Sequence, residues 1–135
     1  MEVTLAVLAD GSNVTKEGKL NIFGIFDAIH LREFPGTHSL AHLILQFECN
    51  AVEFGQTKEI RIIAIDADGK RLAEFGANLE IAQQRDLLNL KVNFPIPVKQ
   101  MRFETPGDYD FIILISGEEK KRVSFKVLET EARNE

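Results

Sequence analysis

The sequence predicts a single all-β domain, an antiparallel β-sandwich of about eight strands with an immunoglobulin-like or jelly-roll-like arrangement. Apolar residues alternate with polar ones along most of the chain, which is the period of a half-buried strand. Turn-forming residues interrupt these runs at short, regular intervals. The 135 residues, 44% hydrophobic and 27% charged, are typical of one globular domain. We expect residues 1–128 to form this domain and residues 129–135 to form a polar C-terminal tail.

The N-terminal half contains three predicted strand regions. The first, Val3 to Leu8, is followed by the turn-forming residues Asp10-Gly11-Ser12-Asn13. Two long runs come next, from Leu20 to Phe34 and from His38 to Cys49, with Pro35-Gly36 between them. Alternation predicts an inward-facing row in each long run: Phe23, Ile25, Ile29 and Leu31 in the first, and Ala41, Leu43, Leu45, Phe47 and Cys49 in the second.

The C-terminal half opens with Asp66-Ala67-Asp68-Gly69, which predicts a type I turn closed by a left-handed glycine. Residues from Leu72 to Ala82 fit either a helix or a strand, and Gly76 and Asn78 favour the strand because both disfavour a helix interior. Three further inward rows follow, the first beside prolines that indicate a sheet edge: Leu88, Leu90, Val92, Phe94 and Ile96; Tyr109, Phe111, Ile113 and Ile115; and Val123, Phe125 and Val127.

Charge and cysteine content bear on the class of partner and on location. The net charge is −5, and the one basic cluster, Lys120-Lys121-Arg122, adjoins Glu118 and Glu119. We therefore expect neither a nucleic acid nor a membrane surface as a partner. With Cys49 as the only cysteine and no long apolar segment, the sequence predicts a cytoplasmic protein without disulfides.

Two histidines suggest one alternative function, a small-ligand or metal-binding site centred on His30 and His42. If the two long runs pair through a loop of Pro35, Gly36 and Thr37, His30 lies opposite His42 on the outer face of the sheet. Two imidazoles provide only half of a zinc site, and His38 lies too far along the strand to complete it. The simpler interpretation is a pair of solvent-facing histidines, and we predict no cofactor.

An enzyme with a loop-assembled acidic site is a second alternative, in which Asp10 and Asn13 would meet Asp66 or Asp68. Aspartates of such turns more often bind their own backbone. Cys49 falls in a buried row, which favours an inert core thiol over a nucleophile. The sequence contains none of the glycine-rich phosphate loops or nucleophile elbows that mark common enzyme sites.

Several strands are apolar on the face that a two-layer sandwich leaves wet. Strands that are apolar on both faces are usually buried on both. We therefore expect a non-enzymatic binding or assembly module that forms a homo-oligomer or holds a protein partner through a sheet face. A covering segment within the chain is the other explanation. The residues assigned to this face are Ile22, Phe26, Leu40, Ile44, Ile112 and Leu114.

Four segments, taken in order, resemble a family of uncharacterised bacterial domains of unknown function. They are Val3-Thr4-Leu5-Ala6-Val7-Leu8-Ala9-Asp10, Gly18-Lys19-Leu20-Asn21-Ile22-Phe23-Gly24-Ile25-Phe26-Asp27, Asp66-Ala67-Asp68-Gly69 and Pro106-Gly107-Asp108-Tyr109-Asp110-Phe111. The resemblance spans nearly the whole chain. It implies a β-sandwich in a bacterial cytoplasm, and it brings no activity, ligand or catalytic residue.

Overall fold

The computed structural model describes residues 1–130, which form an all-β sandwich. Within these residues there are nine strands and one short 3-10 helix, η1. Their bounds are β1 (Glu2–Val14), β2 (Leu20–Phe26), β3 (Ala28–Leu31), β4 (Gly36–Asn50), η1 (Ala51–Glu53), β5 (Thr57–Asp66), β6 (Arg71–Glu80), β7 (Asn89–Phe103), β8 (Gly107–Ile115) and β9 (Glu118–Glu129).

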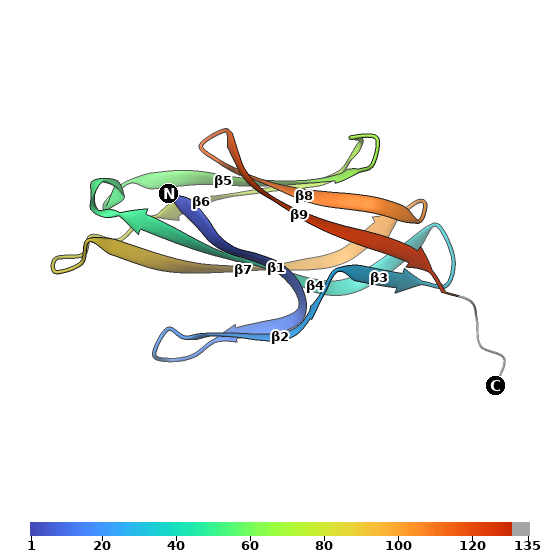
Figure 1. The fold of residues 1–135 in the computed structure, drawn as a ribbon, viewed down its shortest axis with the longest axis horizontal. Coiled ribbons are helices and arrows are strands. Elements are labelled where there is room, and N and C mark those ends of the chain that lie inside the picture. Colours follow the sequence, from blue (N-terminus) through green and yellow to red (C-terminus); the bar gives the residue numbers. More distant parts are fainter. Residues whose placement is uncertain (131–135) are drawn as a thin grey trace.

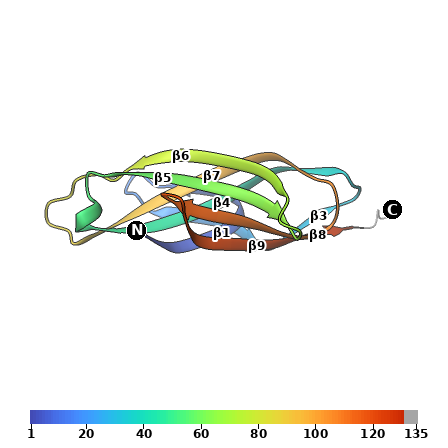
Figure 2. The same ribbon diagram turned by 90° about the horizontal axis from the view of Figure 1, so that it is seen from above.

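The strands form two sheets that pack face to face (Figures 1 and 2). Sheet A has the strand order β2-β1-β4-β7, and sheet B has the order β3-β9-β8-β5-β6. The prediction of a wholly antiparallel sandwich needs one correction, because β3 pairs with β9 in parallel. Two parallel strands of one sheet need a crossover connection. Between β3 and β9 the chain passes through sheet A and then returns to sheet B.

The core lies between the two sheets and is built from the predicted inward rows. The inward rows of β4 and β8 are buried as predicted, and Leu43, Leu45, Phe111 and Ile113 are almost completely buried. Four aromatic rings join the sheets at one end of the core: Phe103 of β7 packs on Tyr109 of β8 and on Phe125 of β9, and Phe125 also stacks on Phe111. The Tyr109 hydroxyl donates a hydrogen bond to the carbonyl of Thr105.

The β5–β6 turn confirms the local prediction. Gly69 has a φ of +82°, and its N–H donates to the carbonyl oxygen of Asp66 at 3.1 Å. One carboxylate oxygen of Asp66 accepts hydrogen bonds from the N–H groups of Asp68 and Lys70, each at 2.9 Å. The segment that follows is β6, so the strand interpretation of this ambiguous region is confirmed.

Strand β7 is the predicted edge strand that carries Pro95 and Pro97. Its inner row packs against the core as expected from Leu90 onward. Leu88 is an exception, because it precedes the strand and is exposed. At the C-terminal end of the chain, β9 extends through Glu129, and residues 131–135 of the predicted polar tail lie outside the described residues.

Strand β1 does not end at Asp10-Gly11-Ser12-Asn13, where turn residues predicted a stop. It continues to Val14, and the turn lies at Thr15–Lys19, with Gly18 at φ +85°. The distal half of β1 bends and forms a hairpin with β2 that lies beneath the outer face of sheet A, giving the molecule a third layer on this side (Figure 1). The short polar side chains at the bend permit this curl instead of a turn.

Two hydrogen bonds hold the hairpin onto the rest of sheet A, and a third, between β4 and β7, orients one of the donors. The amide of Asn93 on β7 donates to the carbonyl of Gly18 at the hairpin tip, at 3.2 Å, while its oxygen accepts from Gln46 on β4 at 2.9 Å. The Ser12 hydroxyl lies 2.8 Å from Nδ1 of His42 on β4.

The predicted pairing of the two long runs is wrong. Strand β4 lies between β1 and β7, and β1 occupies the position that was assigned to the Leu20–Phe34 run.

The Leu20–Phe34 run is two strands rather than one, and they belong to different sheets. Asp27 separates β2 in sheet A from β3 in sheet B. Because β3 belongs to the other sheet, its core-facing residues do not continue the alternating row of β2. Ile29 is buried as predicted, whereas Phe23 and Ile25, assigned to the same inward row, are exposed.

Candidate functional site

The residues predicted for an apolar interface are divided between the two sheets. On the sheet A side, Ile44 is completely buried, although it lies on the outer face between Val7 and Pro95. The hairpin bonds to His42 and to Asn93, the partner of Gln46, on the two sides of Ile44, and we infer that this segment of the chain covers Ile44. Phe26 is half-buried and packs against the main core, and its ring centroid lies 6.0 Å from that of His38. Ile22 is half-buried, and Leu40 is 41% exposed.

Ile112 and Leu114 lie on the outer face of sheet B, on β8. Both are half-buried and flanked by charged side chains of the neighbouring strands, with Arg122 opposite Ile112 and Arg61 opposite Leu114. Arg122 bonds to Glu119 and also approaches Asp110 at 3.7 Å. This face is therefore a narrow apolar strip beneath surface ion pairs, separate from the hairpin side.

The most exposed apolar pair on a strand was missed by sequence reasoning. Phe23 is 53% exposed and Ile25 is 63% exposed, and they stand two residues apart on one face of β2, opposite Gly11 and Ala9 of β1. Asp27 was the signal, since it falls at an inward position of the supposed continuous row. A carboxylate there marks the point at which the row ends.

The structure does not bring His30 and His42 together. His30 is exposed on β3 and pairs with Leu128 of β9, whereas His42 on β4 pairs with Ala9 and Pro97 and contacts Ser12. Within residues 1–130, no three His, Cys, Asp or Glu side chains are placed to hold a metal ion. The metal alternative has thus lost the geometry on which it was based.

Asp10 and Asp66, two of the acidic residues considered for an enzyme site, contact groups of their own turn or strand pair. Asp66 caps the β5–β6 turn, and the Asp10 carboxylate lies against Gly24, where an added Cβ would be 2.4 Å from its oxygen. Asp110 accepts a hydrogen bond from the Ser124 hydroxyl. These contacts correspond to turn and strand roles rather than to two carboxylates placed in different environments around a substrate.

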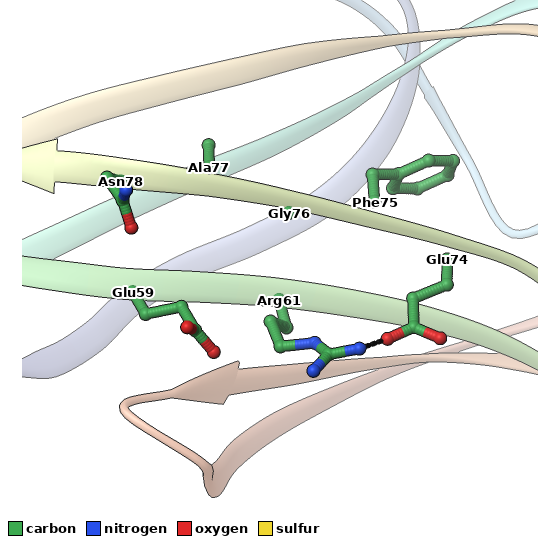
Figure 3. Close-up of a pocket in the computed structure, with 7 residues that line it drawn as sticks. All are labelled: Glu59, Arg61, Glu74, Phe75, Gly76, Ala77 and Asn78. Atoms are coloured by element: carbon green, nitrogen blue, oxygen red, sulfur yellow. Dashed lines mark ion pairs between the residues drawn. The ribbon is translucent and has the colours of Figure 1, made fainter.

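A hollow of about 330 Å³ lies on the outer side of the free edge of sheet B, around Gly76 (Figure 3). Figure 3 shows Glu74 and Asn78 on one side of β6 and Phe75 and Ala77 on the other. Arg61 of β5 forms an ion pair with Glu74, and Glu59 lies next to it. The lining holds no Ser, Thr, Cys or His, and its ionisable side chains are Glu59, Arg61 and Glu74, of which Arg61 and Glu74 pair with each other.

Glu53 is the buried charged side chain of the described residues, and it lies at the end of η1. One carboxylate oxygen accepts from the Met1 amino group at 2.8 Å and lies 3.5 Å from the Lys58 ammonium, while the other accepts from the N–H of Asn50. Burial acts to raise the pKa of Glu53, but these bonds outweigh it, and the pKa lies below its usual value. The nearby Cys49 thiol is fully buried, and burial raises its pKa, which fits the predicted inert role.

Replacing Glu53 with glutamine is expected to destabilise the fold by about 1–3 kcal/mol at pH 7. Because the folded-state pKa is lowered, the ionised carboxylate stabilises the fold above its usual pKa, and this contribution is lost as the pH falls through the folded-state value. Urea unfolding of both proteins at pH 7 and about pH 3 should show the difference shrinking in acid. A constant difference would contradict the role of the charge, and Glu17→Gln, at an exposed site, serves as the control.

None of the elements in residues 1–130 is a helix of the length and apolar character needed to cross a membrane.

The chain belongs to a family of unknown function (DUF6941), whose model matches residues 4–128. No curated protein sequence matches it. Among solved structures, the chain is similar to Pseudomonas fluorescens alkylpurine DNA glycosylase AlkC bound to DNA containing an abasic site analog, with 13% identity and a TM-score of 0.53. The match covers 96% of this chain and 30% of the glycosylase chain. At this identity the likeness concerns the fold alone.

Proposed function

We propose that this member of the family is a non-enzymatic binding module that holds a protein partner on the exposed apolar side of its β1–β2 hairpin. The observation that supports this proposal is the pair Phe23 and Ile25, more than half exposed and adjacent on one face of an edge strand. Aromatic and large aliphatic side chains at the centre of an interface supply most of its binding energy. The proposed class of function, a binding module that uses an apolar sheet face, is the one expected from the sequence, and the proposed site is now the exposed pair Phe23 and Ile25.

The hairpin is also held in place before any partner binds. Asn93 anchors its tip, and Ser12 ties its middle to His42. A preformed surface binds more tightly than a flexible one because less conformational entropy is lost on association. Gly11 pairs with Phe23 and has no side chain, so β1 places no side chain against the Phe23 ring at this position.

The setting we propose is the bacterial cytoplasm. A single buried cysteine fits a reducing compartment, and an acidic net charge fits a protein partner better than a nucleic acid.

A photo-crosslinking amino acid at position 25 tests the proposal in cells that naturally produce the protein. We expect one discrete adduct, identified by mass spectrometry, that does not form when the crosslinker stands at exposed Lys16 at the hairpin turn. With the partner purified, Phe23→Thr combined with Ile25→Thr should weaken binding by about 10-fold to 100-fold in titration calorimetry. Val14→Thr, an exposed hairpin position, is the matched control. Equal adducts at both positions, or unchanged affinity of the double variant, would refute the assignment.

A further inference from the structure

The free edges of the two sheets differ in how they are protected against pairing with another chain. Natural proteins protect edge strands with prolines, lysines, irregular backbone or short length. Strand β7 carries Pro95 and Pro97, and Gln100 stands at positive φ. Strand β2 is interrupted by Gly24 at φ +67°, and β3 has four residues. The unpaired part of β9 carries the charged segment that contains Lys120 and Arg122.

Strand β6 has fewer of these devices than the other free edges. It has ten residues, contains no proline and no lysine, and has no residue at positive φ. From Ala73 to Glu80 it pairs with β5 in one continuous register, and the single irregularity lies at its start. Its other edge has no partner strand among the described residues. An extended, regular edge of this kind is a template for an added strand.

An apolar cavity of about 110 Å³ opens beneath the middle of this edge. It lies between Phe75 and Ala77 of β6 on one side and Phe94 and Ile96 of β7 on the other, where the two sheets leave the sandwich open. Ala77 is exposed although it stands on the inner face of β6. The small Ala77 side chain therefore does not close the sandwich at this point.

We propose that β6 pairs antiparallel with β6 of a second copy of this chain, around a two-fold axis at Gly76, and joins two B sheets into one. A pairing of this type must place inner-face residues opposite inner-face residues. Centred on Gly76, it sets Phe75 opposite Ala77 of the partner subunit, and Ala73 opposite Leu79 of the partner subunit. A large side chain thus meets a small one at each inner-face position, and each Phe75 ring reaches the cavity beside the other copy's Ala77.

The outer face is complementary in the same register. Glu74 stands opposite Asn78 of the partner subunit, so an amide donor faces a carboxylate acceptor at both ends of the contact. Gly76 faces the same glycine across the axis, and no side chain separates the two backbones. Because the interface is isologous, every pair except the glycine pair on the axis occurs twice, which doubles its effect. This inference concerns a different edge from the hairpin and does not depend on the proposed function.

Native mass spectrometry and light scattering on the purified protein should show a dimer at about 10–100 μM. Ala77→Lys should shift it to monomer, because an inward-pointing lysine at an edge is one of the devices that prevent strand pairing. Ala51→Lys, the same change at an exposed position of η1, should remain dimeric. A monomeric wild-type protein over this range, or a dimer that survives Ala77→Lys, would overturn the proposal.

Two further variants test the register and guard against misfolding. Gly76→Cys should form an intermolecular disulfide on treatment with diamide, because opposed residues of antiparallel strands have the Cα separation that a disulfide needs. The backbone has room for this side chain, with the nearest atom 3.8 Å from an added Cβ, and the native Cys49 is buried. If Ala77→Lys unfolds, Asn78→Asp places like charges opposite Glu74 and should weaken the dimer about tenfold. A dimer in which position 76 does not crosslink would refute the register.

Discussion

Replacing Ile44 with glutamate is expected to unfold the domain. The side chain is completely buried although it lies on the outer face of sheet A, between Val7 and Pro95. A carboxylate at this position would lose its hydration and find no ion-pair partner, which costs several kcal/mol in addition to the lost burial of the isoleucine. Since domains of this size have about 5–15 kcal/mol of stability, most of it would be lost.

Far-UV circular dichroism and urea unfolding would measure this effect, with Leu40→Glu as the control on the same strand. Leu40 is partly exposed, so its variant should keep the wild-type spectrum and lose less than about 1 kcal/mol. If Ile44→Glu instead gave a folded protein with an unchanged urea midpoint, the hairpin could not be covering this face in solution.

The two-sided apolar pattern of β4 shows what alternation can and cannot predict. Its inner row, including Leu43 and Phe47, is buried as predicted, because a period of two fixes which residues share a face. In the outer row, Ile44 is also buried, whereas Leu40 is 41% exposed. The pattern could not distinguish an internal cover from a second molecule, since both remove the same surface from water. The β1–β2 hairpin contacts this face from about 30 residues earlier in the sequence, as the Ser12–His42 contact shows. Local periodicity carries no information about a contact at that separation.

Turns and edge strands were predicted correctly where a single residue type restricts the backbone conformation. Gly69 closes the β5–β6 turn in the left-handed region, and the prolines of β7 lie on a sheet edge as expected. The Asp10–Asn13 segment failed because turn-forming side chains also suit a strongly bent strand. In this segment tertiary contacts outweighed the local turn preference, since Ser12 and Gly18 at the hairpin tip hydrogen-bond to sheet A.

The inward placement of Phe23 and Ile25 and the pairing of His30 with His42 were wrong for one reason, the change of sheet at Asp27. Treating residues 20–34 as a single strand carried the inward row across Asp27 and placed Phe23 and Ile25 inside. The same assumption put His30 opposite His42. Whether a chain continues in one sheet or crosses to the other depends on pairings distant in sequence, here between β3 and β9. Register arguments within one hairpin therefore fail when the hairpin itself does not form.

Removing the ring of Phe125 should be the most damaging change within the core that leaves no charge behind. This residue of sheet B stacks on Phe111 at 5.2 Å and Tyr109 at 5.8 Å, and meets Phe103 of sheet A edge-on at 6.0 Å between ring centroids. Phe125→Ala is expected to lower the free energy of unfolding by about 3–5 kcal/mol, through lost burial and the cavity left between the sheets.

The matched control is Phe23→Ala, which deletes the same atoms from an exposed position and should change the free energy of unfolding by less than about 0.5 kcal/mol. Urea titrations of the two variants compare them directly. Equal losses would mean that Phe23 is as buried in solution as Phe125, and this would remove both the hairpin surface and the partner proposed for it. A large loss for Phe125 alone would show that the aromatic contacts join the sheets while the hairpin ring stays free to bind.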